Sequence, residues 1–138
     1  MEHQMAEAHA PRILLVDDDS MVGAALTRIL APFRVTFVQS AVGALARLEA
    51  GGRFDAIVCD IHMPRMDGIQ FHAEVAKLEP SLADRMIFVT GAASSAKAQA
   101  FLERVPNRCL TKPFAADDLR RAVLSAAAGG AGAGGSQA

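Results

Sequence analysis

The feature that most constrains this sequence is a fivefold alternation of short apolar runs with longer segments whose apolar residues recur at helical spacing. The short runs have the length of strands and are rich in Ile, Leu, Val and Phe, as in strands buried on both faces. They cover residues 12–16, 34–38, 54–59, 86–89 and 108–111. Regular alternation of strand and helix predicts an α/β fold, a three-layer α/β/α sandwich around a five-stranded parallel sheet with right-handed crossovers.

Capping and breaking residues mark the ends of the predicted helices. Asp19 or Ser20 can cap the first helix, and Pro32 ends it. The third helix is expected to end near Pro80, and the fourth before Pro106. The five helices are placed by the apolar positions between Val22 and Leu30, Val42 and Leu48, Phe71 and Leu78, Ala98 and Val105, and Leu119 and Ala127.

Length and composition predict one folded domain between two unstructured ends. The chain has 138 residues, of which 51% are hydrophobic, enough for a single core. Residues 1–11 are expected to form a flexible leader, and 12–128 the domain. Residues 129–138 are almost entirely Gly and Ala, a composition that buries too little apolar surface to offset ordering, so we expect a disordered tail.

Charge and residue usage argue against several classes of function. The net charge of −1 and the absence of Trp and Tyr disfavour direct binding of nucleic acid. No apolar run approaches the ~18 residues of a membrane span, and the first residues lack the pattern of a signal peptide. A cytoplasmic protein is therefore expected. Cys59 and Cys109 lie in apolar runs without a CxxC pair and are predicted to be buried, reduced thiols.

Polar residues follow four of the five predicted strands at the point where each strand ends. A parallel sheet brings these ends to one edge, where open α/β sheets bind their ligands. Several carboxylates there repel one another unless a hard cation such as Mg²⁺ binds them. An aspartate beside such a cation can accept a phosphoryl group, while a lysine and a hydroxyl complete the pocket. The residues at this edge are Asp17, Asp18, Asp19, Asp60, Thr90 and Lys112.

Each of these residues also has an ordinary structural explanation. An acidic run such as Asp17 to Asp19 commonly caps a helix. Thr90 can simply end a strand, and a lysine before a proline is usually exposed. His62 lacks a second His or Cys at ligand spacing, which disfavours a transition-metal site. The joint pattern, rather than any single residue, favours the phosphoryl pocket.

Over about residues 12–127 the chain resembles the receiver domain of bacterial two-component response regulators. The resemblance implies a flavodoxin-like sheet of order 2-1-3-4-5, with the pocket at the switch point between the first and third strands. It also implies a cis peptide bond before Pro113. The motifs that carry it are the run 13–16 with Asp17 to Asp19, the segment from Cys59-Asp60 through Pro64 to Asp67-Gly68, Val89-Thr90-Gly91, and Lys112-Pro113-Phe114.

The resemblance implies a phosphorylation-controlled signalling domain in a phosphorelay rather than a separate enzyme. Asp60 would receive a phosphoryl group from the phosphohistidine of a histidine kinase or phosphotransfer protein. Asp17, Asp18, Asp60 and the backbone carbonyl of His62 would hold Mg²⁺. Lys112 would pair with the phosphoryl oxygens, and Thr90 would turn its hydroxyl onto them, which would change how the fourth helix, fifth strand and fifth helix meet partners or a second copy of the chain.

Two positions are distinctive within that resemblance. Cys109 occupies the strand position that in many receivers holds a rotating Tyr or Phe, so the usual aromatic readout is not expected here. His62 stands two residues after the proposed phosphoacceptor, and we expect its ring to tune the lifetime of the phosphoryl group. Comparing dephosphorylation of the parent and His62→Ala tests that expectation.

Three alternatives remain open at this stage. Asp17 and Asp19 also fit the Asp-x-Asp start of haloacid dehalogenase-like phosphatases, with Asp17 as nucleophile and Asp19 as acid/base. That alternative leaves Asp60 and Lys112 unexplained. The chain could instead be a receiver-fold interaction module that is never phosphorylated. As a receiver it could act alone or form the C-terminal part of a hybrid histidine kinase.

Overall fold

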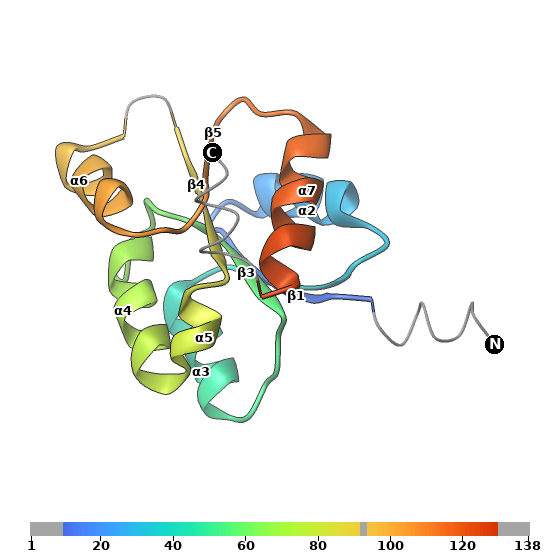
Figure 1. Ribbon diagram of the computed structural model, residues 1–138, viewed down its shortest axis with the longest axis horizontal. Coiled ribbons are helices and arrows are strands. Elements are labelled where there is room, and N and C mark those ends of the chain that lie inside the picture. The colour runs from blue at the N-terminus through green and yellow to red at the C-terminus, as the bar shows by residue number, and fades with distance from the viewer. Residues whose placement is uncertain (1–9, 92–93, 130–138) are drawn as a thin grey trace.

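The computed structural model describes residues 10–91 and 94–129, and these fold around one sheet. Strands and helices alternate as predicted, except that two helices follow the third strand (Figure 1). The strands are β1 (Arg12–Val16), β2 (Arg34–Val38), β3 (Ala56–Asp60), β4 (Met86–Thr90) and β5 (Cys109–Thr111). The helices are α2 (Ser20–Leu30), α3 (Ala41–Glu49), α4 (Gly68–Leu78), α5 (Pro80–Ala83), α6 (Ala96–Arg104) and α7 (Ala116–Ala127).

The sheet has the order β2-β1-β3-β4-β5, and all four strand pairs are parallel. This confirms the predicted sandwich and the flavodoxin-like order. The central strand β3 lies between β1 and β4, with Val16 opposite Cys59 and Asp60 opposite Val89. The carboxyl ends of β1, β3 and β4 therefore meet at one edge of the sheet.

Two hydrophobic clusters cover the two faces of the sheet, which explains why the strand sequences are apolar without interruption. Along β1, Leu14 and Val16 pack into one cluster, and Ile13 and Leu15 into the other. The first cluster includes residues of α3, α4, α5 and α6, and the second includes residues of α2 and α7. Figure 1 shows α2 and α7 together, apart from α3, α4 and α5.

Side-chain caps fix where the helices begin. The Asp19 carboxylate accepts hydrogen bonds from the backbone N–H groups of Met21 and Val22, so Asp19 rather than Ser20 caps α2. Ser40 and Ser95 cap α3 and α6 in the same way. Among the described helices, none is long and apolar enough to cross a membrane.

The structure departs from the sequence-based prediction at a few element boundaries. The third strand starts at Ala56 instead of Phe54. The backbone N–H of Arg12, at the start of β1, donates to the side-chain Oδ2 of Asp55, so it is not used in a strand pair with the residues before Ala56. Pro80 starts the short helix α5, where the prediction had only a helix end. Cys59 is fully buried as expected, but Cys109 is only partly buried. The predicted leader and tail lie almost wholly outside the described residues and stay predictions.

His72 of α4 is expected to make the stability of the fold depend on pH. Its ring centroid lies 5.3 Å from that of Phe101 and 5.9 Å from that of Phe88. Burial lowers the pKa of His72 from its usual 6.5, an effect that Asp84 partly offsets. Just below pH 6.5 the unfolded chain therefore binds more protons at this residue than the folded chain, so the free energy of unfolding should fall as the pH falls. Urea unfolding between about pH 7.5 and about pH 5.5 should show a smaller loss for His72→Gln. An equal loss in both proteins would rule out His72 as the source.

Candidate functional site

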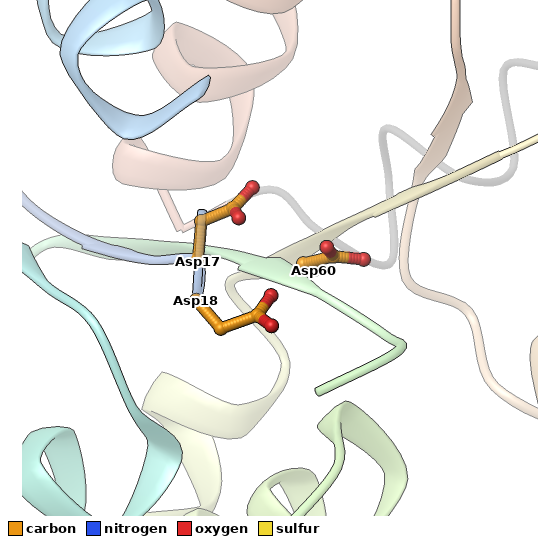
Figure 2. A group of neighbouring side chains, drawn as sticks. All are labelled: Asp17, Asp18 and Asp60. Atoms are coloured by element: carbon orange, nitrogen blue, oxygen red, sulfur yellow. The ribbon is translucent and has the colours of Figure 1, made fainter. Parts of the chain in front are cut away.

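Three carboxylates meet where β1 and β3 end. Asp17 directly follows β1, Asp18 comes next, and Asp60 is the last residue of β3. One carboxylate oxygen of each lies within 4.8 Å of the corresponding oxygens of the other two. Figure 2 shows the three side chains grouped beyond these adjacent strands. The predicted meeting of Asp17, Asp18 and Asp60 at one edge is therefore present in the structure.

The three carboxylates differ in their access to solvent. The side chain of Asp17 is buried at 1% exposure, Asp60 is half-buried and Asp18 is exposed. Asp17 Oδ1 accepts a hydrogen bond from the backbone N–H of Asp19 at 2.9 Å. Asp60 Oδ1 accepts one from the backbone N–H of His62 at 3.2 Å. Backbone N–H groups thus orient the carboxylates of Asp17 and Asp60 through Oδ1 and leave the Oδ2 atoms available to a ligand.

Burial and mutual repulsion make this cluster costly to ionise. Burial is the main cause that raises the pKa of Asp60 above its usual 3.8, and the Asp18 carboxylate adds to it. Burial likewise raises the pKa of Asp17, with further contributions from Asp60 and Asp18. Backbone hydrogen bonds and the charge of Lys112 act in the opposite direction. A bound cation would relieve the repulsion, and an all-oxygen donor set of this kind suits a hard divalent cation.

Lys112 lies close enough to influence the cluster. Its charge lowers the pKa of both Asp17 and Asp60, although it forms no ion pair with any carboxylate in the part of the chain that the structure describes. The backbone N–H of Lys112 donates to the carbonyl of Thr90 at 2.8 Å, which anchors the residue to β4. The peptide bond between Lys112 and Pro113 is cis, as the resemblance implied.

Thr90 is the last residue of β4 and lines a cavity next to the acidic cluster's edge of the sheet. Its side chain is buried at 3% exposure, and its hydroxyl lies 3.4 Å from the carbonyl oxygen of Gly91, as a long hydrogen bond. Thr90 and Cys109 both line a cavity of about 360 Å³ between the end of the sheet and α6. Sequence reasoning placed Thr90 at the correct edge, but it did not anticipate this cavity beside the small Cys109 side chain.

His62 follows Asp60 on the loop that leaves β3. Its side chain is exposed, and its contact with Asp60 is made by the backbone N–H. The proposed roles of its carbonyl in binding metal and of its ring in tuning phosphoryl lifetime remain predictions.

Gly68 is a structural residue of the site that sequence reasoning missed. The Asp67-Gly68 pair was interpreted as a turn, but Asp67 caps α4, with Gln70 completing a capping box, and Gly68 is the first helical residue. A Cβ atom on Gly68 would lie 2.8 Å from the Cα of Ile61 and 2.9 Å from the carbonyl oxygen of Asp60. Only glycine lets the start of α4 pack this closely against the backbone of the phosphoacceptor candidate.

We therefore expect Gly68→Ala to lower the free energy of unfolding by about 1–3 kcal/mol, because the backbone at Asp60 and Ile61 must move to admit the methyl group. Gly91→Ala is the matched control, since a Cβ there meets no atom within 4 Å. Chemical denaturation of both variants measures the difference. Equal stability of the two variants would contradict the close approach.

Comparison with known proteins identifies relatives of this chain. The model of the response regulator receiver domain matches residues 13–124. The C4-dicarboxylate transport transcriptional regulatory protein DctD of Rhizobium meliloti is 38% identical over 112 residues, which make up 80% of this chain and 24% of DctD. The response regulator receiver protein CpdR of Brucella abortus is 33% identical over 110 residues, 78% of this chain and 89% of CpdR.

A third relative, the sensor histidine kinase CheAY of Helicobacter pylori, is 31% identical over 80% of this chain and 14% of its own length. The chain thus spans a small part of several relatives that it matches. Among solved structures, a response regulator receiver protein from Sinorhizobium medicae is 29% identical with a TM-score of 0.75, covering 88% of this chain and 97% of that one. A CheY-like receiver domain protein from Methanospirillum hungatei is 28% identical with a TM-score of 0.76, covering 86% and 94%.

Proposed function

Because this chain belongs to the response regulator receiver domain family, we propose that Asp60 is its phosphoacceptor and that Asp17 and Asp18 bind Mg²⁺ beside it. The observation that carries the proposal is the convergence of three carboxylates at one strand edge, with the charge of Lys112 acting on two of them. As a receiver, the chain is part of a two-component signalling system.

The proposed reaction transfers a phosphoryl group from a phosphohistidine to Asp60. A carboxylate oxygen of Asp60 attacks phosphorus and forms a P–O bond. The P–N bond breaks, its electron pair stays on the ring nitrogen, and neutral imidazole leaves because its other ring nitrogen carries a proton. Asp60 is half-buried, so a donor can reach its side chain, and the His62 N–H holds that side chain in place. The Lys112 ammonium, free of a carboxylate partner among the described residues, would pair with the phosphoryl oxygens.

Asp17, Asp18, Asp60 and the His62 carbonyl would hold the cation, which neutralises charge on the phosphoryl oxygens when bound. Their fit to Mg²⁺ rests on the oxygen-only donors, and on the burial and carboxylate repulsion that raise the pKa of Asp17 and Asp60.

Mg²⁺ should therefore raise the thermal unfolding temperature of the parent. At a Mg²⁺ concentration of about 100 times its Kd, the free energy of unfolding should increase by about 2.7 kcal/mol. Asp17→Asn should lose this response. Burial raises the pKa of Asp17 and so disfavours its charge in the folded state, and the variant should therefore also unfold at a higher temperature than the parent when Mg²⁺ is absent. Calorimetry suits the measurement, since the chain lacks Trp and Tyr. Equal Mg²⁺ responses would argue against Asp17 as a ligand.

The direct test of the function is the intact mass of the protein after incubation with a small-molecule phosphodonor. We expect one added phosphoryl group in the presence of Mg²⁺ and none after chelation. If rapid hydrolysis hides the adduct, beryllofluoride, a stable phosphoryl mimic, should still bind with Mg²⁺. Failure of both would favour the alternative of an interaction module that is not phosphorylated.

The partners of the proposed reaction are a histidine kinase or a histidine phosphotransfer protein. Support comes from the family and from relatives whose names include sensor kinases. We also propose a cytoplasmic location and a domain that covers residues 12–128. Two copies of the chain would pair through the face formed by α6, β5 and α7. Membership of a hybrid kinase remains a further proposal.

The phosphohydrolase alternative assigns the nucleophile to Asp17 rather than Asp60. The deep burial of Asp17 and the use of its Oδ1 by the Asp19 N–H disfavour attack from that residue. Asp60 is more accessible and belongs to the same cluster.

A further inference from the structure

A cavity of about 620 Å³ opens at the edge of the sheet opposite Asp60. It lies where β1, β3 and β4 begin, so it is separated from the acidic cluster by the length of the strands. Its volume falls in the range of small-molecule sites. The lining residues are Arg12, Leu48, Gly51, Gly52, Arg53, Phe54, Asp55, Glu79 and Arg85.

Three arginines from separate segments surround this cavity. Arg12 begins β1, Arg53 lies on the loop between α3 and β3, and Arg85 directly precedes β4. The guanidinium carbon of Arg12 lies 5.9 Å from the centre of the Phe54 ring, which holds this cation against an aromatic wall. Three guanidinium groups from separate segments form a setting suited to phosphate oxygens.

The charged side chains that line the cavity are incompletely paired with one another. Arg85 Nε is buried and has no hydrogen-bond partner among the described residues. Its Nη2 faces Glu79 at 3.6 Å, a loose pair in which the Glu79 side chain is 53% exposed. At this distance, and with the Glu79 carboxylate half exposed, the pair is weak and a ligand anion can replace Glu79.

Asp55, the second acidic residue of the lining, already accepts a backbone hydrogen bond. Asp55 Oδ2 accepts the backbone N–H of Arg12 at 2.8 Å. Counting formal charges, three arginines against Asp55 and Glu79 leave one excess positive charge on the lining. The excess positive charge of the lining favours an anion.

The loop that carries Arg53 has a fixed shape. Gly51 has φ of 98°, and a Cβ on Gly52 would lie 2.8 Å from the carbonyl oxygen of Arg47, so both positions require glycine. The backbone therefore presents Arg53 and the Phe54 ring from a defined position. Together with Leu48, Phe54 supplies an apolar wall beside the cations.

We propose that this cavity binds a small phosphate ester with an apolar or aromatic group, such as a nucleoside monophosphate. The phosphate would pair with Arg53 and Arg85 and displace Glu79, while the other end of the ligand would lie along Leu48 and Phe54. This site is independent of phosphorylation at Asp60.

Titration calorimetry at low ionic strength tests the proposal with adenosine monophosphate, inorganic phosphate and adenosine. We expect the monophosphate to bind most tightly, and adenosine to bind at least about tenfold more weakly because it lacks the charge-assisted hydrogen bonds. Arg53→Gln and Arg85→Gln should each weaken binding roughly tenfold or more. Glu79→Gln should strengthen it, because it removes the competing carboxylate.

Arg34→Gln is the matched control, because Arg34 begins β2 at the same edge and is exposed but does not line the cavity. Its binding should equal that of the parent. Arg53 is exposed, so Arg53→Gln keeps the test valid even if Arg85→Gln unfolds. No binding of the monophosphate by the parent at about 10 mM, or equal weakening by Arg34→Gln, would overturn the proposal. Since the Asp60 reaction can be followed by intact mass in the same samples, failure of this site is distinguishable from failure of the proposed function.

Discussion

The Asp60→Asn variant is expected to take up no phosphoryl group from a phosphodonor in the presence of Mg²⁺, whereas the parent takes up one. An amide lacks the anionic oxygen that attacks phosphorus. Its carbonyl oxygen can still accept the His62 N–H, so the loop after β3 should keep its shape. Intact-protein mass spectrometry measures the adduct, and thermal unfolding confirms the fold.

Asp18→Asn is the companion variant, because it alters the same cluster without removing the nucleophile. It should retain some phosphorylation and require more Mg²⁺. Full phosphorylation of Asp60→Asn would show that another side chain accepts the group, and the assignment of Asp60 would then be wrong.

The Lys112→Gln variant should be phosphorylated roughly 10²- to 10³-fold more slowly than the parent, the cost typical of losing one group that stabilises transition-state charge. Lys112 influences both Asp17 and Asp60 without pairing with a described carboxylate, so its ammonium is available to phosphoryl oxygens. Its backbone bond to Thr90 does not depend on the side chain. The rate is measured by stopping the reaction at intervals and determining the phosphorylated fraction by intact-protein mass spectrometry.

Lys97→Gln is the matched control, because Lys97 is an exposed lysine of α6 and removes the same charge from another part of the molecule. Its rate should stay within a factor of about two of the parent, as screening weakens distant charges. Equal rates for Lys112→Gln and the parent would remove Lys112 from the chemistry.

The sheet and its layers could be predicted because their signals are local and repeated. Each strand is a continuous apolar run, since both faces are covered, and each helix shows an apolar stripe with a cap or breaker at its ends. The parallel arrangement then brings Asp17 and Asp60 to one edge without further information. The three-carboxylate cluster was for this reason predictable before any coordinates.

Other features depend on contacts between segments distant in sequence and left no comparable signal. The Asp67-Gly68 pair is typical of a turn, and only the approach of α4 to the backbone of Asp60 shows why glycine stands there. The late start of β3 follows from the bond between Asp55 and Arg12. The cavity lined by three arginines joins segments that are up to 73 residues apart (Arg12 to Arg85), so periodicity could not reveal it.

The most direct test of the account locates the phosphoryl group on the chain. Borohydride reduces an aspartyl phosphate to homoserine, so peptide mass spectrometry of the phosphorylated, reduced protein identifies the residue that was modified. We predict homoserine at position 60 alone, formed only when Mg²⁺ and the phosphodonor are both present. Homoserine at position 17 would instead support the phosphohydrolase chemistry and contradict the assignment of Asp60.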